Sequence, residues 1–484
     1  MESAIANLRT VQRLRELITT QLKRHPLTWM VGASALIFFV CSSLRHSLFE
    51  STAFDLGIYD QVAYLMSQGL PPISSFLDIH HLGNHAAWSF YALGPLYALY
   101  PSVHWLFAVQ ALSLAAGAWP SWGLARQAGL QQGQALAIAA VYLLYPVVFN
   151  VNLFDFHPEV MAIPALLGAI LAARLDRPLW FTLGILFVLG CKDALSLLVA
   201  AMGVWLFFFE KKRRCGAIAL FAGTAWFLFV TQALIPHFKD GGGPGALGRY
   251  GYLGDSVIEM ALNLILKPGL VLGRVFSLDT LEYLVLLSAP ILWGLVPRYF
   301  APLVSILPTL GLNILSDVGE QRDLIHQYSL PLLPFLLLVL IASLASGRAW
   351  LKRGRWIVVW SLVSFLCLAK FGYFWSIYLD TIDTRRASQM AVAQVEGTGG
   401  VVTTAAIAPH LSHRPTIELQ QTVANADAET LAADFQYVLL NLRHPGWDST
   451  IEVSTALRDR LQAAPQFSLR YQQDDVYLFE RNQN

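Results

Sequence analysis

The chain has 484 residues, of which 55% are hydrophobic and 13% are charged. A soluble globular protein carries about 25% charged residues, so this composition is typical of a protein that crosses a membrane many times. The formal net charge of +1 lacks the basic excess of nucleic-acid-binding proteins, and we expect no such partner. The four cysteines form no close-spaced motif, which argues against a disulfide framework or a cysteine-based metal site.

The chain begins with a basic segment, residues 1–26, whose apolar residues recur at helical spacing. This pattern predicts an amphipathic helix lying on the cytoplasmic membrane surface. The first apolar span follows at about 27–45, and the basic residues before it predict a cytoplasmic N-terminus. No small-residue cleavage site follows this span, so we expect it to be retained.

Further apolar runs divide residues 27–375 into roughly eleven predicted spans, judged by the length that a helix needs to cross the hydrocarbon core. With this count, every cluster of lysine and arginine between spans falls on the cytoplasmic side, as the distribution of positive charge in membrane proteins requires. We expect residues 86–100, a short run with a proline, to lie on or dip into the outer leaflet. The runs after the first lie near 104–125, 133–150, 158–174, 178–191, 194–209, 216–236, 281–296, 299–315, 328–346 and 356–375.

From residue 376 the composition becomes that of a soluble protein. Sequence patterns predict strands at 401–402, 437–440 and 476–479 and helices at 426–434 and 452–463. We therefore predict a mainly α-helical, polytopic transmembrane bundle over 27–375 and a small α/β domain over 376–484. The number of spans places this domain outside the cytoplasm.

Ionisable residues gather in the segments that this topology places outside, chiefly in the loop 46–103. Such residues at a membrane edge are energetically unfavourable and are therefore candidates for function. A second outer loop, 237–280, is glycine-rich, and we interpret it as flexible and able to gate a substrate. The outer ionisable residues are Asp55, Asp60, His80, His81, His85, Asp155, His157, Glu159, Lys192, Asp193, Asp317, Glu320, Arg322 and His326.

Asp55 is the candidate general base. A base must reach a hydroxyl proton and have its pKa tuned by partial burial, which a loop held against the membrane can supply. On a helix, Asp60 would point about 140° away from Asp55, so we do not expect the two to form one carboxylate clamp. The other interpretation is that Asp55 caps the helix that begins near Leu56.

Two groups of residues suggest a divalent metal. His81 and His85 would share a helix face, a spacing that can hold a metal, although the glutamate of the metalloprotease pattern is missing and hydrogen-bonding histidines are favoured. Around Pro158 we expect an extended chain, in which residues two apart point the same way. Asp155, His157 and Glu159 would then converge on a cation, or form a polar cap where two spans meet.

Two cations are candidates for holding a phosphate. Lys192 lies at the tip of a short hairpin of spans that we expect in a hydrated cavity, where it either pairs with Asp193 or neutralises a phosphate. Arg322 could bind a phosphate through two hydrogen bonds or form a structural ion pair, and His326 belongs to the same outer corner.

Several motifs of the chain resemble those of the bacterial membrane proteins grouped as DUF2079. The resemblance covers most of the sequence, and the motifs around Asp55 and Asp155 are the most specific. Where the family would have Lys-Glu-Asp, this chain has Cys191-Lys192-Asp193. The other matching motifs are Phe54–Gln61, the region of His80 and His81, Pro95–Pro101, Leu144–Pro146, Asp155–Glu159 and Pro409–Arg414.

In layout, that family is similar to the GT-C superfamily of membrane glycosyltransferases. The resemblance implies a multi-pass protein of the bacterial inner membrane that takes a sugar from a polyprenyl-phosphate carrier. Asp55 would be the base, while Asp155, His157 and Glu159 would form a second acidic site. Lys192 or Arg322 would hold the carrier phosphate. A transporter or lipid flippase and a non-catalytic assembly protein are the alternatives, and the residues leave the need for a metal open.

Overall fold

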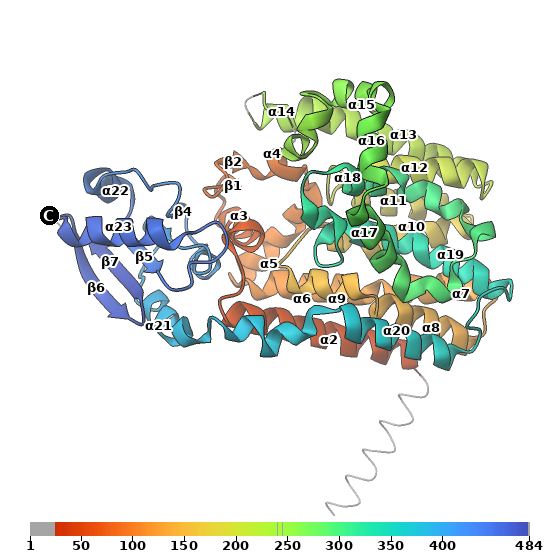
Figure 1. Cartoon of the computed structure of the whole chain (residues 1–484), viewed down its shortest axis with the longest axis horizontal. Coiled ribbons are helices and arrows are strands. Elements are labelled where there is room, and N and C mark those ends of the chain that lie inside the picture. Colours follow the sequence, from red (N-terminus) through yellow and green to blue (C-terminus); the bar gives the residue numbers. More distant parts are fainter. Residues whose placement is uncertain (1–24, 240, 244, 483–484) are drawn as a thin grey trace, which may run out of the picture.

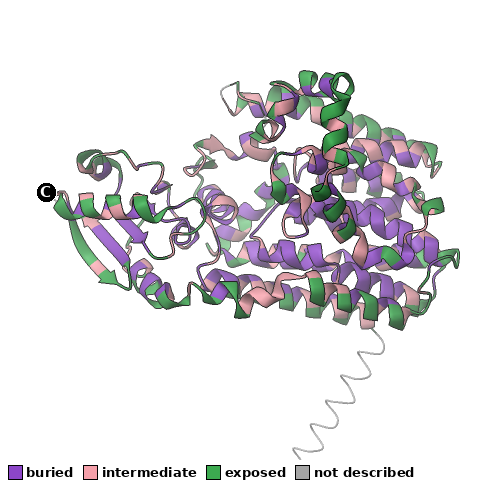
Figure 2. Ribbon diagram, viewed as in Figure 1, coloured by how far each residue is buried: buried purple, intermediate pink, exposed green. Residues whose placement is uncertain are grey.

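The computed structural model describes residues 25–239, 241–243 and 245–482 (Figure 1). The amphipathic helix predicted over residues 1–26 lies almost wholly outside the described residues. Figure 1 shows a broad helical bundle with a smaller unit of strands and helices at one end, where the chain finishes. The bundle holds the largest hydrophobic core of the described chain. The central strands of the smaller unit's sheet are buried, with a hydrophobic core on each face, whereas one edge strand is mostly exposed (Figure 2).

The helices of the bundle lie mostly in the apolar runs of the sequence, and the others lie in the segments 46–103 and 237–280 that were predicted as outer loops. They are α2 (Pro26–Ser47), α3 (Ile58–Ser67), α4 (His81–His85), α5 (Gly94–Leu99), α6 (His104–Ala116), α7 (Ala118–Gln127), α8 (Gln132–Leu143), α9 (Pro146–Leu153), α10 (Glu159–Arg174), α11 (Pro178–Leu189), α12 (Leu195–Phe208), α13 (Arg213–Phe229), α14 (Ile235–His237), α15 (Val257–Leu266), α16 (Pro268–Val275), α17 (Leu278–Ser288), α18 (Leu307–Leu315), α19 (Leu333–Ala345) and α20 (Gly354–Leu368).

Four helical segments of the described chain are long and apolar enough to cross a membrane, or up to six if each of two bent pairs counts as one span. The other apolar runs form shorter or interrupted helices, such as α11, which has 12 residues. The number of spans, about eleven, therefore stays a prediction. The four segments are Pro26–Ser47, Gln132–Leu153, Arg213–His237 and Gly319–Ala345.

Glycines bring α12 and α13 into close contact. A Cβ atom on Gly203 would lie 2.4 Å from the backbone nitrogen of Leu220, and one on Gly216 would lie 2.6 Å from that of Phe207. Small residues at such positions let membrane helices approach each other closely, where van der Waals packing stabilises them. This contact holds the second half of α12 against the first half of α13.

The two predicted outer loops contain regular structure. Residues 88–99 form η2 (Trp88–Leu93) and α5, each six residues long and too short to cross about 30 Å of hydrocarbon. The loop 237–280 contains η4 (Gly245–Leu253) and then α15 and α16, which meet at an 82° bend. Our interpretation of 237–280 as simply flexible is therefore wrong, because its apolar residues are regularly spaced and form helices.

The C-terminal unit is built on a five-stranded sheet of order β4-β3-β5-β7-β6. Strand β3 pairs in parallel with β4 and β5, and β7 pairs antiparallel with β5 and β6. The predicted strands and helices are present, whereas β4 and β6 were not expected. The elements are α21 (Ile382–Val392), β3 (Val401–Thr403), β4 (Ile417–Leu419), α22 (Ala428–Asp434), β5 (Tyr437–Asn441), α23 (Ile451–Ala463), β6 (Phe467–Gln473) and β7 (Val476–Arg481).

The first outer loop joins the sheet to the bundle. Phe49 and Ala53 belong to the hydrophobic core on the face of the sheet that α21 covers. A two-stranded ribbon, β1 (Ile73–Ser74) and β2 (Ile79–His80), continues this contact. The hydroxyl of Ser75 donates to the carbonyl of Ile417 over 2.6 Å and accepts from its N–H over 3.0 Å. The loop that carries Asp55 is thus held between the bundle and the sheet.

Candidate active site

Asp55 occupies an unusual backbone conformation in the short segment η1 (Ala53–Gly57). Its φ is 69° and its ψ is −64°, backbone angles that residues other than glycine rarely adopt. Such strain persists only where the surrounding structure imposes it, and it is frequent at functional sites. Helix α3 starts after Gly57 with no side-chain cap, so the interpretation of Asp55 as a helix cap is not supported.

The Asp55 carboxylate faces His157. Its Oδ2 atom lies 3.1 Å from Nε2 of His157, whose side chain is 2% exposed, whereas that of Asp55 is 35% exposed. The imidazole stacks on the ring of Phe154 at 5.4 Å, and the ring of Tyr59 lies 6.5 Å away. The pair therefore has one buried member, held by aromatic rings, and one member open to a ligand.

The charges of the site support one another. Burial alone would raise the pKa of Asp55, but His157, with Lys192 and His85, lowers it below its ordinary value. Burial lowers the pKa of His157, but Asp55 and Glu159 outweigh this effect and raise it. Each partner therefore shifts the pKa of the other towards its charged form.

Asp155 holds the loop from behind. Its carboxylate forms an ion pair with Arg45 near the end of α2 and accepts a hydrogen bond from the N–H of Thr52 over 3.2 Å. The Arg45 guanidinium also donates to the carbonyl of Glu50. These contacts tie the first span, the loop before Asp55 and the turn after α9 together.

The hairpin tip contributes two further ion pairs. Lys192 pairs with Glu159 at the start of α10, and both side chains are largely buried. Asp193 accepts from His85 at 3.3 Å, and its N–H donates to the His85 carbonyl over 3.0 Å. Lys192 and Asp193 therefore pair with other partners and not with each other.

The prediction that Asp155, His157 and Glu159 converge on one cation is wrong. Their side chains meet three different partners, Arg45, Asp55 and Lys192, because Asp155 has a φ of 76° and Glu159 already begins a helix. Among the described residues, no group of three or more His, Cys, Asp or Glu side chains is arranged to hold a metal ion.

The histidines predicted as a metal pair are also separated. Nε2 of His81 lies 3.1 Å from the carbonyl of Ala87, while His85 faces Asp193. His80 caps α4 by accepting from the N–H of Leu82 and stacks on Phe238 at 4.2 Å. These contacts fit the hydrogen-bonding alternative.

The remaining predicted residues lie outside the Asp55 site. Asp60 contacts the C-terminal unit, where Ser412 donates to its carboxylate and His413 lies 3.1 Å away. Arg322 donates to the carbonyls of Ser316 and Ile314 and lies 4.0 Å from Asp279. Asp317 pairs with Arg274, Glu320 is exposed, and His326 pairs with Asp323 at 2.6 Å.

Two cations meet at Tyr328, beside the site. The guanidinium of Arg249 lies 5.2 Å from the centre of the Tyr328 ring, and Nζ of Lys192 lies 5.6 Å from it. Arg249 also donates to the Tyr328 hydroxyl over 3.0 Å. Our sequence reasoning missed Arg249, Tyr328 and Arg45. The sequence did contain a signal for Arg45. This arginine lies at the end of the first span that is predicted to be outside, whereas arginine and lysine are usually found on the cytoplasmic side.

A comparison with solved structures finds a similar overall fold in ArnT. ArnT from Cupriavidus metallidurans, in a structure bound to undecaprenyl phosphate, superposes with a TM-score of 0.53 at 13% identity, covering 94% of this chain and 98% of that chain. The oligosaccharyltransferase of Archaeoglobus fulgidus gives a TM-score of 0.47 at 12% identity, covering 87% and 70%.

A search of curated protein sequences finds no significant match. A family model described as a predicted membrane protein, DUF2079, matches residues 45–478. This match includes the loop of Asp55, the bundle and nearly all of the sheet. The chain therefore belongs to the DUF2079 family of predicted membrane proteins, and its fold is of the GT-C type.

Proposed function

We propose that this protein is a glycosyltransferase that moves a sugar from a polyprenyl-phosphate carrier to an acceptor hydroxyl, with Asp55 as general base. The observation that carries the proposal is the strained, partly exposed Asp55 carboxylate held against the buried His157. The acceptor oxygen forms a bond to the anomeric carbon of the sugar as the carbon–oxygen bond to the carrier phosphate breaks. Asp55 takes the hydroxyl proton, and the phosphate leaves with the bonding electrons.

The environment of Asp55 supports this role. Its side chain is 35% exposed, so an acceptor hydroxyl can come within hydrogen-bond distance of the carboxylate. His157 is a positioning residue, because its buried ring fixes the direction of the carboxylate. Asp155 contacts Thr52 and Arg45 and so holds the loop that positions Asp55.

The leaving phosphate needs cationic partners, and Arg249 and Lys192 are the best placed. Arg249 can make paired hydrogen bonds to a phosphate, and Lys192 adds a second positive charge across Tyr328. Cations aimed at a developing charge stabilise the transition state. Arg322, the alternative from the sequence, is a weaker candidate because it lies outside the Asp55 site, where its guanidinium donates to two backbone carbonyls.

The fold supports the choice of donor. ArnT, which shares the fold, is a protein whose structure holds undecaprenyl phosphate. The proposal places the Asp55 site and the C-terminal unit on the extracytoplasmic side of a bacterial inner membrane, since the basic turns lie at the other ends of the helices. No observation in the described residues favours a transporter or an assembly protein over this function.

The test is a transfer assay with the purified full chain in vesicles that contain polyprenyl-phosphate sugars with a radiolabelled sugar. We expect Asp55→Asn to lower the transfer rate by about 10²–10⁴-fold, the usual contribution of a general base. Asp255→Asn, at an exposed aspartate between η4 and α15, is the matched control and should keep the full rate. Transfer by Asp55→Asn at the rate of the unsubstituted protein would remove Asp55 from the mechanism.

A further inference from the structure

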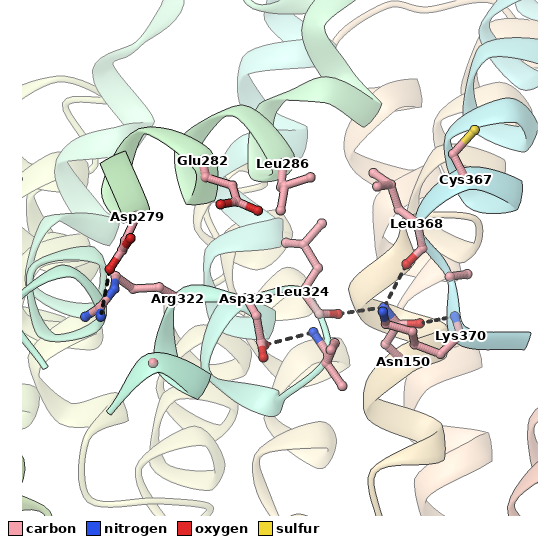
Figure 3. Close-up of a pocket in the computed structure, with 13 residues that line it drawn as sticks. Asn150, Asp279, Glu282, Leu286, Arg322, Asp323, Leu324, Cys367, Leu368 and Lys370 are labelled. Carbon is pink, nitrogen blue, oxygen red and sulfur yellow. Dashed lines mark hydrogen bonds and ion pairs between the residues drawn. The ribbon is translucent and has the colours of Figure 1, made fainter. Parts of the chain in front are cut away.

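A cavity of about 400 Å³, whose lining residues do not include Asp55, opens between α17 and the end of α20 (Figure 3). We call it the α17–α20 cavity. Its walls are apolar side chains such as Leu286 and Leu324, and its charged lining residues are Asp279, Glu282, Arg322, Asp323 and Lys370. The volume is in the range of pockets that hold a small ligand.

The base of the cavity is rigid. The side-chain amide of Asn150 donates to the carbonyls of Leu324 and Leu368 and accepts from the N–H of Lys370 over 2.8 Å. Figure 3 shows these bonds joining three separate segments beneath the cavity. Because every one of them is made by backbone groups and one amide, the cavity keeps its shape without a ligand.

Two of the five charged lining residues already have close partners. Asp323 accepts from the backbone N–H groups of Ile325 and His326, each over 2.9 Å, and from the His326 ring. Arg322 donates to backbone carbonyls and lies 4.0 Å from Asp279. These contacts leave Arg322 and Asp323 little capacity for a ligand.

Glu282 and Lys370 are different. Within the described residues, neither side chain has an ion-pair or hydrogen-bond partner, and the Lys370 ammonium lies 5.3 Å from the centre of the Tyr373 ring. Glu282 shares its exposed helix face with Leu278 and Leu281, which are 82% and 58% exposed. A carboxylate that has no cationic partner and lies beside exposed leucines is a candidate for binding a positively charged group together with an apolar one.

We propose that the α17–α20 cavity binds the head group of a zwitterionic membrane phospholipid that carries a primary ammonium. The ammonium donates hydrogen bonds to Glu282, the phosphate lies at Lys370, and the acyl chains lie along the exposed apolar faces of α17 and α20. The site is independent of sugar transfer at Asp55.

The lining distinguishes this head group from the other common ones. A quaternary ammonium cannot donate hydrogen bonds and is recognised by aromatic rings, and none of the residues lining the cavity is aromatic. An anionic lipid is disfavoured because the lining has three carboxylates against two cations. A primary ammonium beside a phosphate satisfies both free side chains.

The test measures thermal unfolding and lipid retention of the purified full chain in detergent with added lipids of identical acyl chains. The lipids carry phosphoethanolamine, phosphocholine or phosphoglycerol head groups. We expect phosphatidylethanolamine to raise the melting temperature most and to be retained in native mass spectra. Equal effects of all three lipids would overturn the proposal, and so would equal stabilisation by soluble phosphoethanolamine, which would assign the cavity to a free metabolite.

Matched variants assign the effect to the cavity. Glu282→Gln and Lys370→Gln should each weaken apparent binding of phosphatidylethanolamine by about tenfold, the worth of one charge-assisted contact, without lowering the melting temperature in plain detergent. The controls are Glu320→Gln and Lys267→Gln, at exposed residues that do not line the cavity. Undiminished selectivity in both cavity variants would refute the site.

Discussion

At the scale of single residues, the site depends on charges whose partners come from distant parts of the chain. Asp55 meets His157, and Glu159 meets Lys192. The sequence marked all four as outer ionisable residues, because such residues are unfavourable at a membrane edge. It could not pair them, since pairing depends on how separate turns pack, and it assumed one extended strand where Asp155 turns the chain aside.

The Glu159–Lys192 pair gives a prediction of stability. We expect Lys192→Met to lower the free energy of unfolding by about 3–5 kcal/mol, because it leaves the buried Glu159 carboxylate without a partner. Combining it with Glu159→Gln should restore most of this loss. Denaturant unfolding in detergent measures both effects. Lys212→Met is the control: its partner Asp176 is 79% exposed, so the change should be about 1 kcal/mol or less.

At the scale of elements, α3 connects the Asp55 loop to the C-terminal unit through Asp60. This carboxylate is 2% exposed and accepts from the hydroxyl of Tyr97 over 2.6 Å and from Ser412. His413 lies 3.1 Å away and stacks on Tyr64 at 5.0 Å. Asp60, one of the outer ionisable residues that the sequence marks as candidates for function, therefore holds two parts of the protein together.

This contact should depend on pH. Burial lowers the pKa of His413, but Asp60 outweighs this effect and raises it above its ordinary value. The protonated His413 binds Asp60 only in the folded protein, so this pair stabilises the folded state fully below about pH 6.5, the ordinary pKa of histidine. The stabilisation is lost as the pH rises through the raised pKa of His413 in the folded state. We therefore expect limited proteolysis between α20 and β3 to accelerate as the pH rises from about 6 to 9.

His413→Asn should remove that pH dependence, while His237→Asn, at a histidine of the second outer loop without an ion pair, should leave it unchanged. Proteolysis that is independent of pH in the unsubstituted protein would contradict the role of His413. Tyr97, Ser412, Tyr64 and the adjacent Arg414 are the other groups that face the pair, and none of them changes charge below about pH 9 by its ordinary pKa.

Elements with a strong hydrophobic periodicity could be predicted from the sequence, whereas elements that depend on pairing with other segments could not. The long apolar runs and the strands β3, β5 and β7 were found where hydrophobicity indicated. β4 is as short as β3 but has Glu418 at its centre, and β6 has a mostly exposed burial pattern, so neither can be told from a loop by its hydrophobicity. The bend between α15 and α16 lies at Pro268, the first residue of α16. Our interpretation of this segment as a glycine-rich loop did not take this proline into account.

At the scale of the whole molecule, Asp55, the hairpin tip and the C-terminal sheet lie at one edge of the bundle, because direct contacts join them. Cysteine labelling tests this in a variant whose four native cysteines are replaced by serine. A membrane-impermeant maleimide should label Asp78→Cys and Glu429→Cys in intact cells, but Lys211→Cys only after permeabilisation. Labelling of Asp78→Cys and Lys211→Cys from the same side would contradict the arrangement.

The central claim is that a polyprenyl phosphate reaches the Asp55 site from the membrane. A structure of the full chain with a bound polyprenyl phosphate tests it most directly. The account predicts the phosphate at Arg249 and Lys192, beside Tyr328, with room for a sugar between it and the Asp55 carboxylate. A phosphate bound at the basic turns on the opposite edge of the bundle, with Asp55 closed off from it, would contradict the account.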